Sequence, residues 1–366
     1  MMLYKLLCRI NRERFEPVVI SLMDWGTLGD RISALDIPLY AIGMKSGMFT
    51  PESIWQFIRT LRQIKPVLIQ GWMYHGNLAA QLAGVFLPKS VSVLWNVRQS
   101  LYSLEYEKKG TAAVIKICAY LSYLPKKIIY NSRISAGQHE QISYDKNKSL
   151  IITNGFDTNQ FVPSPEAHWS FCQELEIPAN VVLIGLIGRY HPMKDHPNFL
   201  KSAALLGKHD LASNVQFVLA GQGVDWHNQH LCQLAKDLNL VEKIHLLGER
   251  HDIPRITAAL DIACSSSSHS EGFPNIIGEA MSCGVPCVVT DVGDSPWIVG
   301  ETGRVVPRCN PQALANAWKE LINLGTEGRT VLGKAARERV IENFSLDSVV
   351  AEYEALYESV LAKKLN

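Results

Sequence analysis

The chain lacks long hydrophobic runs. Its longest apolar stretch, residues 111–125, is too short to cross a bilayer and contains Lys116. No signal-peptide pattern is visible either, because residues 2–10 already show the polar and apolar pattern of a helix. We therefore predict a chain that does not span a membrane, although it can still lie on one.

Cysteine chemistry is also scarce. The eight cysteines are scattered without a CxxC pair, and no histidine cluster has the spacing of metal ligands. Cys283 and Cys287 are four residues apart, but no further ligands accompany them. This pattern favours a reduced, cytoplasmic protein and gives no sign of a metal site. We also expect no bound cofactor.

The sequence also lacks a large excess of positive or of negative charge. Lysine and arginine number 36 and acidic residues 35, so the formal net charge of +1 gives no field that would attract nucleic acid. Apolar residues make up 47% of the chain, which is enough for a sizeable core. A length of 366 residues suggests two domains rather than one.

Short apolar runs alternate with amphipathic segments of helix length. The runs are rich in Val, Ile and Leu, as buried parallel strands require. Strands are predicted at 17–22, 67–70, 92–96, 127–130, 150–153, 181–187, 215–220, 244–247, 262–265, 287–290 and 303–306. Helices are predicted between the strands, for example at 51–64, 111–123, 196–206, 226–238 and 311–324. This alternation is typical of α/β proteins with doubly wound parallel sheets.

The predicted strands divide into two Rossmann-like domains. Residues 161–180 contain Pro163, Pro165 and Pro178 and lack a strand pattern, so they are predicted to link the domains. We assign residues 1–160 to an N-terminal domain and 181–345 to a C-terminal domain. A helix within 346–366 is expected to pack back towards the first. Two such domains would leave a cleft, and ligands bind at the carboxyl ends of the strands.

The N-terminal order of elements is unusual. A helix at residues 2–10 precedes the first predicted strand, whereas a βαβ unit needs a strand before that helix. We expect that a first strand and its glycine-rich turn, about 15 residues, are absent from the sequence. A truncated gene model or expression product is preferred over a divergent fold.

The strongest local motif is EGFPNIIGE at residues 271–279. Glu271 and Glu279 flank a turn made by Gly272 and Pro274, and Asn275 is a suitable N-cap for the following helix. Free backbone amides at the start of that helix would face an anion. Glu279 would accept hydrogen bonds from a ribose diol, and Glu271 would lie beside a sugar. The alternative is a capped surface helix with two solvated glutamates.

A second motif, GRYHPMKDH at residues 188–196, follows the apolar strand at 181–187. Arg189 and Lys194 therefore lie at the carboxyl end of a strand, where two cations suit a pyrophosphate. They would also stabilise a leaving nucleotide diphosphate. The alternative is an ordinary basic loop in which Asp195 pairs with Lys194.

Together these motifs resemble glycosyltransferase family 4. The resemblance is carried by the 189–194 loop, the two glutamates of 271–279, and the segments 220–223, 247–250 and 289–293, with Gly303. It implies a GT-B fold and a retaining, metal-independent glycosyltransferase. Such an enzyme would move a hexose from a nucleotide diphosphate sugar to a glycan or lipid-linked acceptor in polysaccharide or lipopolysaccharide assembly.

The resemblance also implies roles for single residues. Arg189 and Lys194 would bind the diphosphate, Glu279 the ribose and Glu271 the donor sugar. The segment 248–250 would lie beside the base. The residues expected to contact the donor are Arg189, Lys194, Gly221, Gly248, Arg250, Glu271, Gly272, Phe273, Asn275, Ile276, Ile277 and Glu279. The glycines Gly221 and Gly223 carry a weaker signal, because a plain tight turn explains them equally well.

His75 follows the predicted strand at 67–70, and family members carry a histidine in the matching segment. The resemblance assigns His75 to positioning of the sugar or to a hydrogen bond in the transition state. Retention of configuration would come from a double displacement on Glu271 or from front-face attack, in which the departing phosphate takes the acceptor's proton. Front-face attack is favoured. The predicted catalytic residues are thus His75, Glu271, Arg189 and Lys194.

The segment 98–148 has a local excess of basic charge. It contains nine lysines and arginines against four acidic residues, and Tyr102, Tyr106, Tyr120 and Tyr123 are interspersed among them. Such a surface suits an anionic membrane or a lipid-pyrophosphate acceptor, and our hypothesis is peripheral attachment at the cytoplasmic face of the membrane. The alternative is a solvated helix face.

Two other functions remain open. One is a nucleotide-sugar 2-epimerase with the same architecture, although the two glutamates of 271–279 argue against it. The other is a nucleotide-sugar-binding protein without activity, since the expected missing turn would line the cleft.

Overall fold

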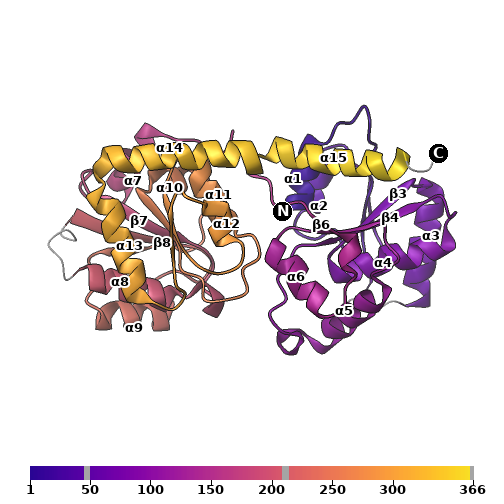
Figure 1. Ribbon diagram of the computed structural model, residues 1–366, viewed down its shortest axis with the longest axis horizontal. Coiled ribbons are helices and arrows are strands. Elements are labelled where there is room, and N and C mark those ends of the chain that lie inside the picture. Colours follow the sequence, from indigo (N-terminus) through magenta and orange to yellow (C-terminus); the bar gives the residue numbers. More distant parts are fainter. Residues whose placement is uncertain (45–49, 208–213, 363–366) are drawn as a thin grey trace. The chain divides into compact units, whose positions relative to one another are not determined.

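The structure is a computed structural model that describes residues 1–44, 50–207 and 214–362. It forms two compact units (Figure 1). Unit 1 contains Met1–Gly155 and Leu346–Asn366, and unit 2 contains Phe156–Ser345. Paired strands are parallel in both units, as the alternation of strands and helices predicts.

Unit 1 is a split parallel sheet with helices around it. Strands β3 to β6 form one sheet in the order β3-β4-β5-β6, while β1 pairs only with β2, so β3 is an edge strand among the described residues. Its elements are α1 Met2–Arg9, β1 Val19–Ser21, α2 Gly29–Ser33, β2 Leu39–Ala41, α3 Pro51–Ile64, β3 Leu68–Trp72, α4 Met73–Phe86, β4 Ser92–Val97, α5 Lys109–Leu121, β5 Lys127–Tyr130, α6 Arg133–Gln141, β6 Ser149–Ile151 and α15 Leu346–Ala362, with short 3₁₀ turns at Leu104–Tyr106 and Lys146–Lys148.

The turn from β3 into α4 is tight because Gly71 has no side chain. A Cβ at this position would lie 2.6 Å from the carbonyl oxygen of Gly76 and 2.5 Å from the Cα of Asn77. The Asn77 side chain then accepts a hydrogen bond from the backbone of Asn96 at 3.0 Å, which fixes α4 against β4. This packing sets the first turn of α4, and with it His75, at the carboxyl end of the sheet.

Helix α15 belongs to unit 1 and packs on α1. Its buried Val349 and Tyr353 share a hydrophobic cluster with Met2 and Leu6 of α1. The Tyr353 hydroxyl also accepts a hydrogen bond from the Arg98 guanidinium at 2.9 Å. Arg98 therefore connects the end of β4 to the last helix and is not part of a solvated basic surface.

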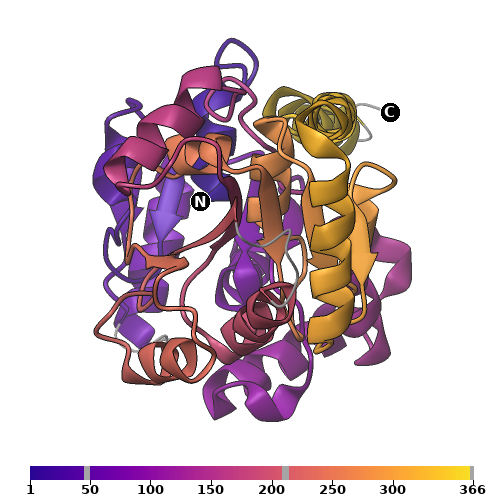
Figure 2. The same ribbon diagram turned by 90° about the vertical axis from the view of Figure 1, so that its left-hand side faces the viewer.

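Unit 2 is a six-stranded parallel sheet in the order β12-β11-β10-β7-β8-β9. Figure 2 shows the same ribbons turned by 90°. Its elements are α7 Pro165–Glu174, β7 Val182–Ile187, a 3₁₀ turn at Pro192–Lys194, α8 His196–Leu206, β8 Val215–Ala220, α9 Gln229–Asp237, β9 Ile244–Leu246, α10 Ile253–Ala259, β10 Ile262–Ser265, α11 Asn275–Ser282, β11 Cys287–Thr290, α12 Ser295–Val299, β12 Arg304–Val306, α13 Pro311–Asn323 and α14 Gly325–Phe344.

Both faces of this sheet are buried, as near-continuous apolar strands predict. Alternate residues of β7 enter two different clusters: Ile184 packs with Phe199 of α8 and Trp318 of α13. Leu183 packs on the opposite face with Phe171 of α7, among residues of α10, α11 and α14. Loops at the carboxyl edge are thus held by strands that cannot shift without disturbing two cores.

Strand β2 and helix α7 are among the elements that the structure adds to the sequence prediction. Strand β2, Leu39–Ala41, has only three residues and an exposed Tyr40, and the apolar segment 37–42 that contains it was not predicted as a strand. Helix α7 lies inside the segment 161–180 that is predicted to be a linker, and its Phe171 is fully buried in unit 2.

Candidate functional site

The predicted donor residues gather in loops at the carboxyl edge of the unit 2 sheet. The loop after β7 is held to the loop after β8 by backbone hydrogen bonds, from Gly188 to Ala220 and from Tyr190 to Gln222, both at 2.8 Å. It ends in a 3₁₀ turn whose last residue is Lys194. Asp195 then adopts a left-handed φ of 49° and caps α8 by accepting a hydrogen bond from the Asn198 backbone at 3.1 Å.

Lys194 forms an ion pair with Glu271 and not with Asp195. The side chains of Lys194 and Glu271 are 19% and 9% exposed, so water screens the pair only weakly. The Ser267 hydroxyl donates a second hydrogen bond to the same carboxylate oxygen, Oε1, at 2.8 Å. The structure therefore brings together the two motifs that the sequence predicted separately.

Serine hydroxyls and backbone amides join the two loops. The Ser268 amide donates to the Met193 carbonyl at 2.8 Å, and the Ser266 hydroxyl donates to the Lys194 carbonyl at 2.8 Å. On the other side, the Thr290 hydroxyl of β11 donates to the Ser267 carbonyl at 2.6 Å. The run of four serines at residues 265–268 is a signal for these contacts that was not used in the prediction of the site.

Gly293 allows the Glu271 loop to approach β11. Its φ is +62°, and a Cβ there would lie 2.2 Å from the Glu271 carbonyl oxygen. The following amide, that of Asp294, donates to the Gly272 carbonyl at 2.9 Å. The segment 289–293, which is part of the resemblance, thus supports the Glu271 loop from the end of β11.

Gly221 allows a similar close approach of backbones, beside the loop that carries Arg189 and Lys194. Its φ of +146° favours glycine, and a Cβ would lie 2.3 Å from the carbonyl oxygen of Gly188. Its amide donates to the Gly248 carbonyl at 2.7 Å, so three loop starts converge here. Gly221 and Gly248 shape the edge of the sheet through their backbones.

Arg189 is exposed and, within the ranges that the structure describes, has no hydrogen-bond or ion-pair partner. Its neighbour His191 has a pKa below the ordinary value, first because of partial burial and then because of the charges of Arg189, His269 and Lys194. The loop is therefore a positively charged region with one free guanidinium, which favours an anion.

Helix α11 begins at Asn275, and Pro274 occupies the N-cap. The prediction of Asn275 as the N-cap was wrong, because Pro274 with its φ of −70° holds the extended backbone that precedes the helix. Asn275 and Ile276 are in the first turn, where backbone amides lack partners within the helix. Glu279, partly buried, lies one turn further along.

Two predicted donor residues are core residues by their side chains. Phe273 stacks on Phe156 with ring centroids 5.9 Å apart and meets Trp297 and Phe344 edge to face. Ile277 is 2% exposed in the same cluster. Only the backbone at these positions remains for ligand contact.

Arg250 is engaged within the protein. Its guanidinium contacts both carboxylate oxygens of Asp252 at 2.8 Å and Glu174 of α7 at 2.7 Å. Hydrogen bonds from Arg250 hold the pKa of Asp252 and of Glu174 below their usual values. The Arg250 side chain thus stabilises its own loop.

His75 lies in unit 1, in the first turn of α4, and is partly exposed. Within the described part of the chain it has no hydrogen-bond or ion-pair partner. Met73, two residues earlier, has a φ of +63°, so the strand turns sharply into the helix there. His75 is presented at the carboxyl end of β3, as predicted from its position after that strand.

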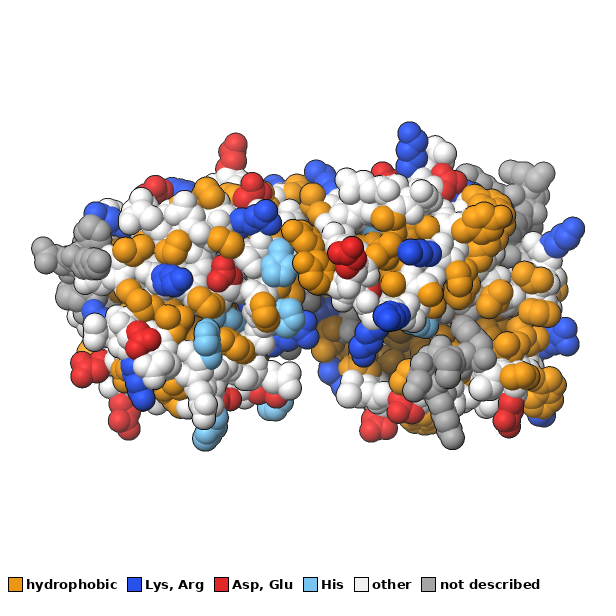
Figure 3. Space-filling view, turned by 90° about the horizontal axis from the view of Figure 1, so that it is seen from below, with side chains coloured by type: hydrophobic (Ala, Val, Ile, Leu, Met, Phe, Trp, Pro, Cys, Tyr) orange, Lys and Arg blue, Asp and Glu red, His pale blue; other side chains and the backbone are white. Residues whose placement is uncertain are grey.

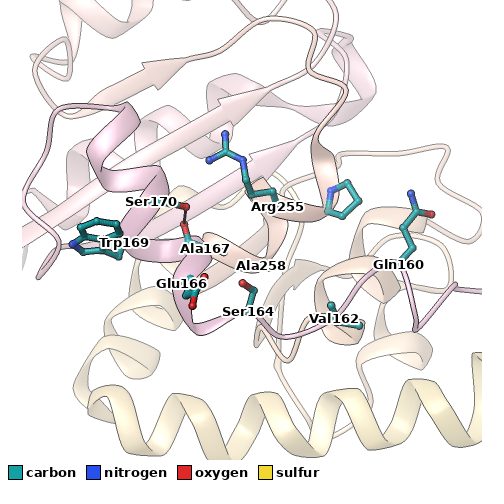
Figure 4. A pocket seen from close by; sticks show the side chains of 10 residues that line it. Gln160, Val162, Ser164, Glu166, Ala167, Trp169, Ser170, Arg255 and Ala258 are labelled. Carbon is teal, nitrogen blue, oxygen red and sulfur yellow. Dashed lines mark hydrogen bonds between the residues drawn. The ribbon is translucent and has the colours of Figure 1, made fainter.

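An open groove of about 600 Å³ lies elsewhere on unit 2 (Figure 4). It is lined by α7, α10 and the segment before α7, including Trp169, Glu166 and Arg255. None of the predicted site residues lines it, so it is separate from the Lys194–Glu271 site. Among the described residues, no group of His, Cys, Asp and Glu has the arrangement of a metal site, and no helix is long and apolar enough to cross a membrane.

The chain is similar in sequence to known proteins over part of its length. Residues 181–323 match the model of the glycosyl transferases group 1 family. The chain is 24% identical over 298 residues to the UDP-Gal:alpha-D-GlcNAc-diphosphoundecaprenol alpha-1,3-galactosyltransferase of Escherichia coli, covering 79% of this chain and 73% of that protein. It is 30% identical over 155 residues to the N-acetyl-alpha-D-glucosaminyl L-malate synthase of Bacillus anthracis, covering 42% of this chain and only 40% of that protein.

Solved structures agree on the fold. The glycosyltransferase of Rickettsia africae superposes with a TM-score of 0.84 at 21% identity, over 98% of this chain and 94% of that one. Anabaena HepE in complex with UDP-glucose gives 0.79 at 21% identity, over 97% and 96%. The fold is therefore GT-B with two Rossmann-like domains. Sequence relatives besides the Escherichia coli galactosyltransferase include a lipopolysaccharide core biosynthesis glycosyltransferase of Rhizobium meliloti.

Proposed function

We propose that this chain is a retaining glycosyltransferase of family 4 that transfers a hexose from a nucleotide diphosphate sugar, with unit 2 holding the donor. The observation that carries the proposal is the convergence of Arg189, Lys194 and Glu271 at one sheet edge. Two cations and one oriented carboxylate match a diphosphate that is joined to a polyhydroxylated ring. The complex of Anabaena HepE with UDP-glucose supports a nucleotide sugar as the ligand class.

Each group has a proposed task in donor binding. Arg189 and Lys194 contact the diphosphate, and amides of the first turn of α11 add hydrogen bonds to it. Glu279 binds the ribose, Glu271 contacts the sugar, and the backbone of 248–250 borders the base. Arg189 and Lys194 supply the positive charge that the leaving group needs, so we propose a reaction without a metal ion or cofactor.

For the reaction we propose front-face attack with retention. The bond between the anomeric carbon and the phosphate oxygen breaks, and its electron pair stays on the nucleotide diphosphate. The acceptor hydroxyl forms the new bond and passes its proton to the departing phosphate. Glu271 orients the sugar, and His75 positions it or donates a hydrogen bond in the transition state.

A Glu271→Gln variant tests this route. It keeps most of its kcat if Glu271 only orients the sugar, because an amide oxygen still accepts a hydrogen bond. A covalent adduct between the sugar and Glu271, detected by mass spectrometry after denaturing quench, would instead establish a double displacement.

We propose that the acceptor is a glycan or a lipid-linked sugar and that unit 1 contacts an anionic membrane. The outer face of α5 carries Lys116, Ile117 and Tyr120, and Tyr120 is 79% exposed. Tyr106 nearby in sequence is 80% exposed. In Figure 3, hydrophobic side chains lie beside lysine and arginine on the visible face of unit 1. Aromatic rings with lysines between them suit a lipid interface on the cytoplasmic side.

Liposome sedimentation tests the membrane contact. Vesicles of phosphatidylglycerol and phosphatidylcholine should retain the wild-type chain more than phosphatidylcholine alone, and a Lys116→Glu/Tyr120→Ser variant should lose the preference. A matched Lys319→Glu variant in α13 of unit 2 should keep it. Equal sedimentation with both vesicle types would contradict the contact.

Hydrolysis of a panel of nucleotide sugars tests the donor proposal. UDP-, GDP- and ADP-hexoses are offered without acceptor, and slow release of the nucleotide diphosphate is measured. Turnover of one of them, lost in an Arg189→Ala/Lys194→Ala variant, is expected. The absence of both turnover and binding for the whole panel would contradict the proposed function.

A further inference from the structure

Ser267 is fixed at a point where two strands and one carboxylate meet. It lies two residues after the end of β10 and is 1% exposed. Its carbonyl accepts a hydrogen bond from the Thr290 hydroxyl of β11 at 2.6 Å, and its own hydroxyl donates to Glu271 Oε1 at 2.8 Å. The backbone that carries this hydroxyl is thus held by the neighbouring strand, not by the loop alone.

The contacts of Glu271 are one-sided. Lys194 Nζ and the Ser267 hydroxyl both bind Oε1. Its other oxygen, Oε2, has no hydrogen-bond partner within the described ranges. A carboxylate in this state has one oxygen anchored and one available, which is the arrangement that a sugar hydroxyl needs from its acceptor atom.

We propose that Ser267 is a positioning residue that holds Glu271 so that Oε2 receives a hydroxyl of the donor sugar. The inference rests on the proposed function and extends it to a residue that touches neither the reacting atoms nor the diphosphate. Ser267 acts through Glu271 only.

A second donor on Oε1 is needed because Lys194 has two tasks. Its ammonium has three N–H groups and is expected to bind diphosphate oxygens as well as Glu271. When a diphosphate attracts Lys194, the Ser267 hydroxyl remains on Oε1 and keeps the carboxylate in place. Loss of Ser267 should therefore weaken recognition of the sugar and leave recognition of the diphosphate largely intact.

The test compares binding of UDP with binding of UDP-glucose, UDP-galactose and UDP-N-acetylglucosamine by calorimetric titration of the full chain. In Ser267→Ala we expect UDP affinity within threefold of wild type. The affinity gained from the preferred sugar should fall about tenfold, as loss of a hydrogen bond to a charged group implies. Ser267→Thr, which keeps the hydroxyl, should restore most of the gain.

Two further variants distinguish positioning from general damage. Ser202→Ala removes another buried hydroxyl of unit 2, one that donates to the Asn198 carbonyl at 2.6 Å, and should leave sugar recognition unchanged. In a Glu271→Ala background, which removes both carboxylate oxygens, Ser267→Ala should have no further effect on the sugar-dependent part of binding. Thermal unfolding confirms that each variant is folded.

The outcomes separate the two proposals. If the wild type binds neither UDP nor these sugars, the positioning role is overturned together with this donor choice. Binding of a UDP-sugar that Ser267→Ala leaves unchanged overturns the positioning role and leaves the proposed function standing. An equal loss for UDP and the UDP-sugar would show that Ser267 only supports the fold of the loop, and this too would overturn the inference.

Discussion

Lys194 and Glu271 are 77 residues apart in the chain, and their side chains form an ion pair at the carboxyl edge of the unit 2 sheet. The two groups come from different βα loops, one after β7 and one after β10. Because both side chains are largely buried, the pair places a positive and a negative charge side by side in a weakly screened environment. Donor binding and loop stability should therefore depend on the same contact.

Lys194 and Arg189 should differ when each is replaced by methionine. Lys194→Met leaves the buried carboxylate of Glu271 without its cation, so we expect weaker nucleotide diphosphate binding together with a loss of about 2 kcal/mol in the free energy of unfolding. Arg189→Met should weaken the same binding about tenfold at unchanged stability, because Arg189 is exposed. Urea unfolding and calorimetric titration measure both. A Lys194→Met protein as stable as Arg189→Met would contradict the role of the pair.

Gly293 and Gly325 provide a matched comparison of space around glycine. Both have left-handed φ values, +62° and +66°, but a Cβ at Gly293 would strike the Glu271 carbonyl, whereas nothing lies within 4 Å at Gly325. Gly325→Ala should cost about 1 kcal/mol from backbone strain alone. Gly293→Ala should cost more and also reduce nucleotide-sugar binding, because the Glu271 loop must move. Equal stability losses and equal binding would argue against this packing.

The Arg250 cluster should make stability depend on acid. Hydrogen bonds from Arg250 lower the pKa of both Asp252 and Glu174 in the folded chain. Such groups stabilise the fold above their unfolded pKa near 4, and this stability is lost as the pH falls below it. Arg250→Met should flatten the decline in unfolding free energy between about pH 5 and 2. Arg304→Met should not flatten this decline, because Glu320, the partner of Arg304, is 61% exposed.

His139 should add a second pH dependence, at higher pH. The ring is fully buried, its Nδ1–H donates to the Ser135 carbonyl at 2.7 Å, and Nε2 accepts from the Tyr74 hydroxyl at 2.9 Å. Burial lowers the pKa of His139 to about 4. Between pH 6.5 and 4, His139 is protonated in the unfolded chain but stays neutral in the folded chain. As the pH falls through this range, the free energy of unfolding should therefore fall by roughly 3 kcal/mol from this group.

A His139→Gln variant checks this assignment. It should be less stable at pH 7, and its unfolding free energy should decline less steeply than that of the wild type between pH 7 and 5. His196, also buried with a pKa lowered to about 4, remains in both proteins and contributes equally. An unchanged slope would mean that His139 is already protonated, or solvated, in the folded chain.

The sequence predicted the parts of unit 2 that depend on local pattern. Strands β8, β10 and β11 begin and end where their apolar runs do, because burial on both faces leaves little choice of residue. The predicted site residues Lys194 and Glu271 lie together because loops at the carboxyl edge of parallel strands must be neighbours.

The side-chain contacts that the sequence did not predict are those in which a charged or polar group has several possible partners in the fold. Asp195 was considered as the partner of Lys194, but its side chain caps α8 by accepting a hydrogen bond from the Asn198 backbone. This contact spans only three residues, so it forms at little entropic cost. The bond between Arg98 and Tyr353 joins residues 255 apart, and no pattern in either segment marks it. Arg250 was predicted to contact the nucleotide base, yet its guanidinium forms ion pairs with the carboxylates of Glu174 and Asp252.

The most direct test of the central claim is calorimetric titration of the wild-type chain and of an Arg189→Met/Lys194→Met variant with UDP-, GDP- and ADP-hexoses. The proposed donor site predicts saturable binding of at least one nucleotide sugar by the wild type and a loss of more than tenfold in affinity in the variant. Binding that survives the double substitution, or no binding of any nucleotide sugar by the folded wild type, would contradict it.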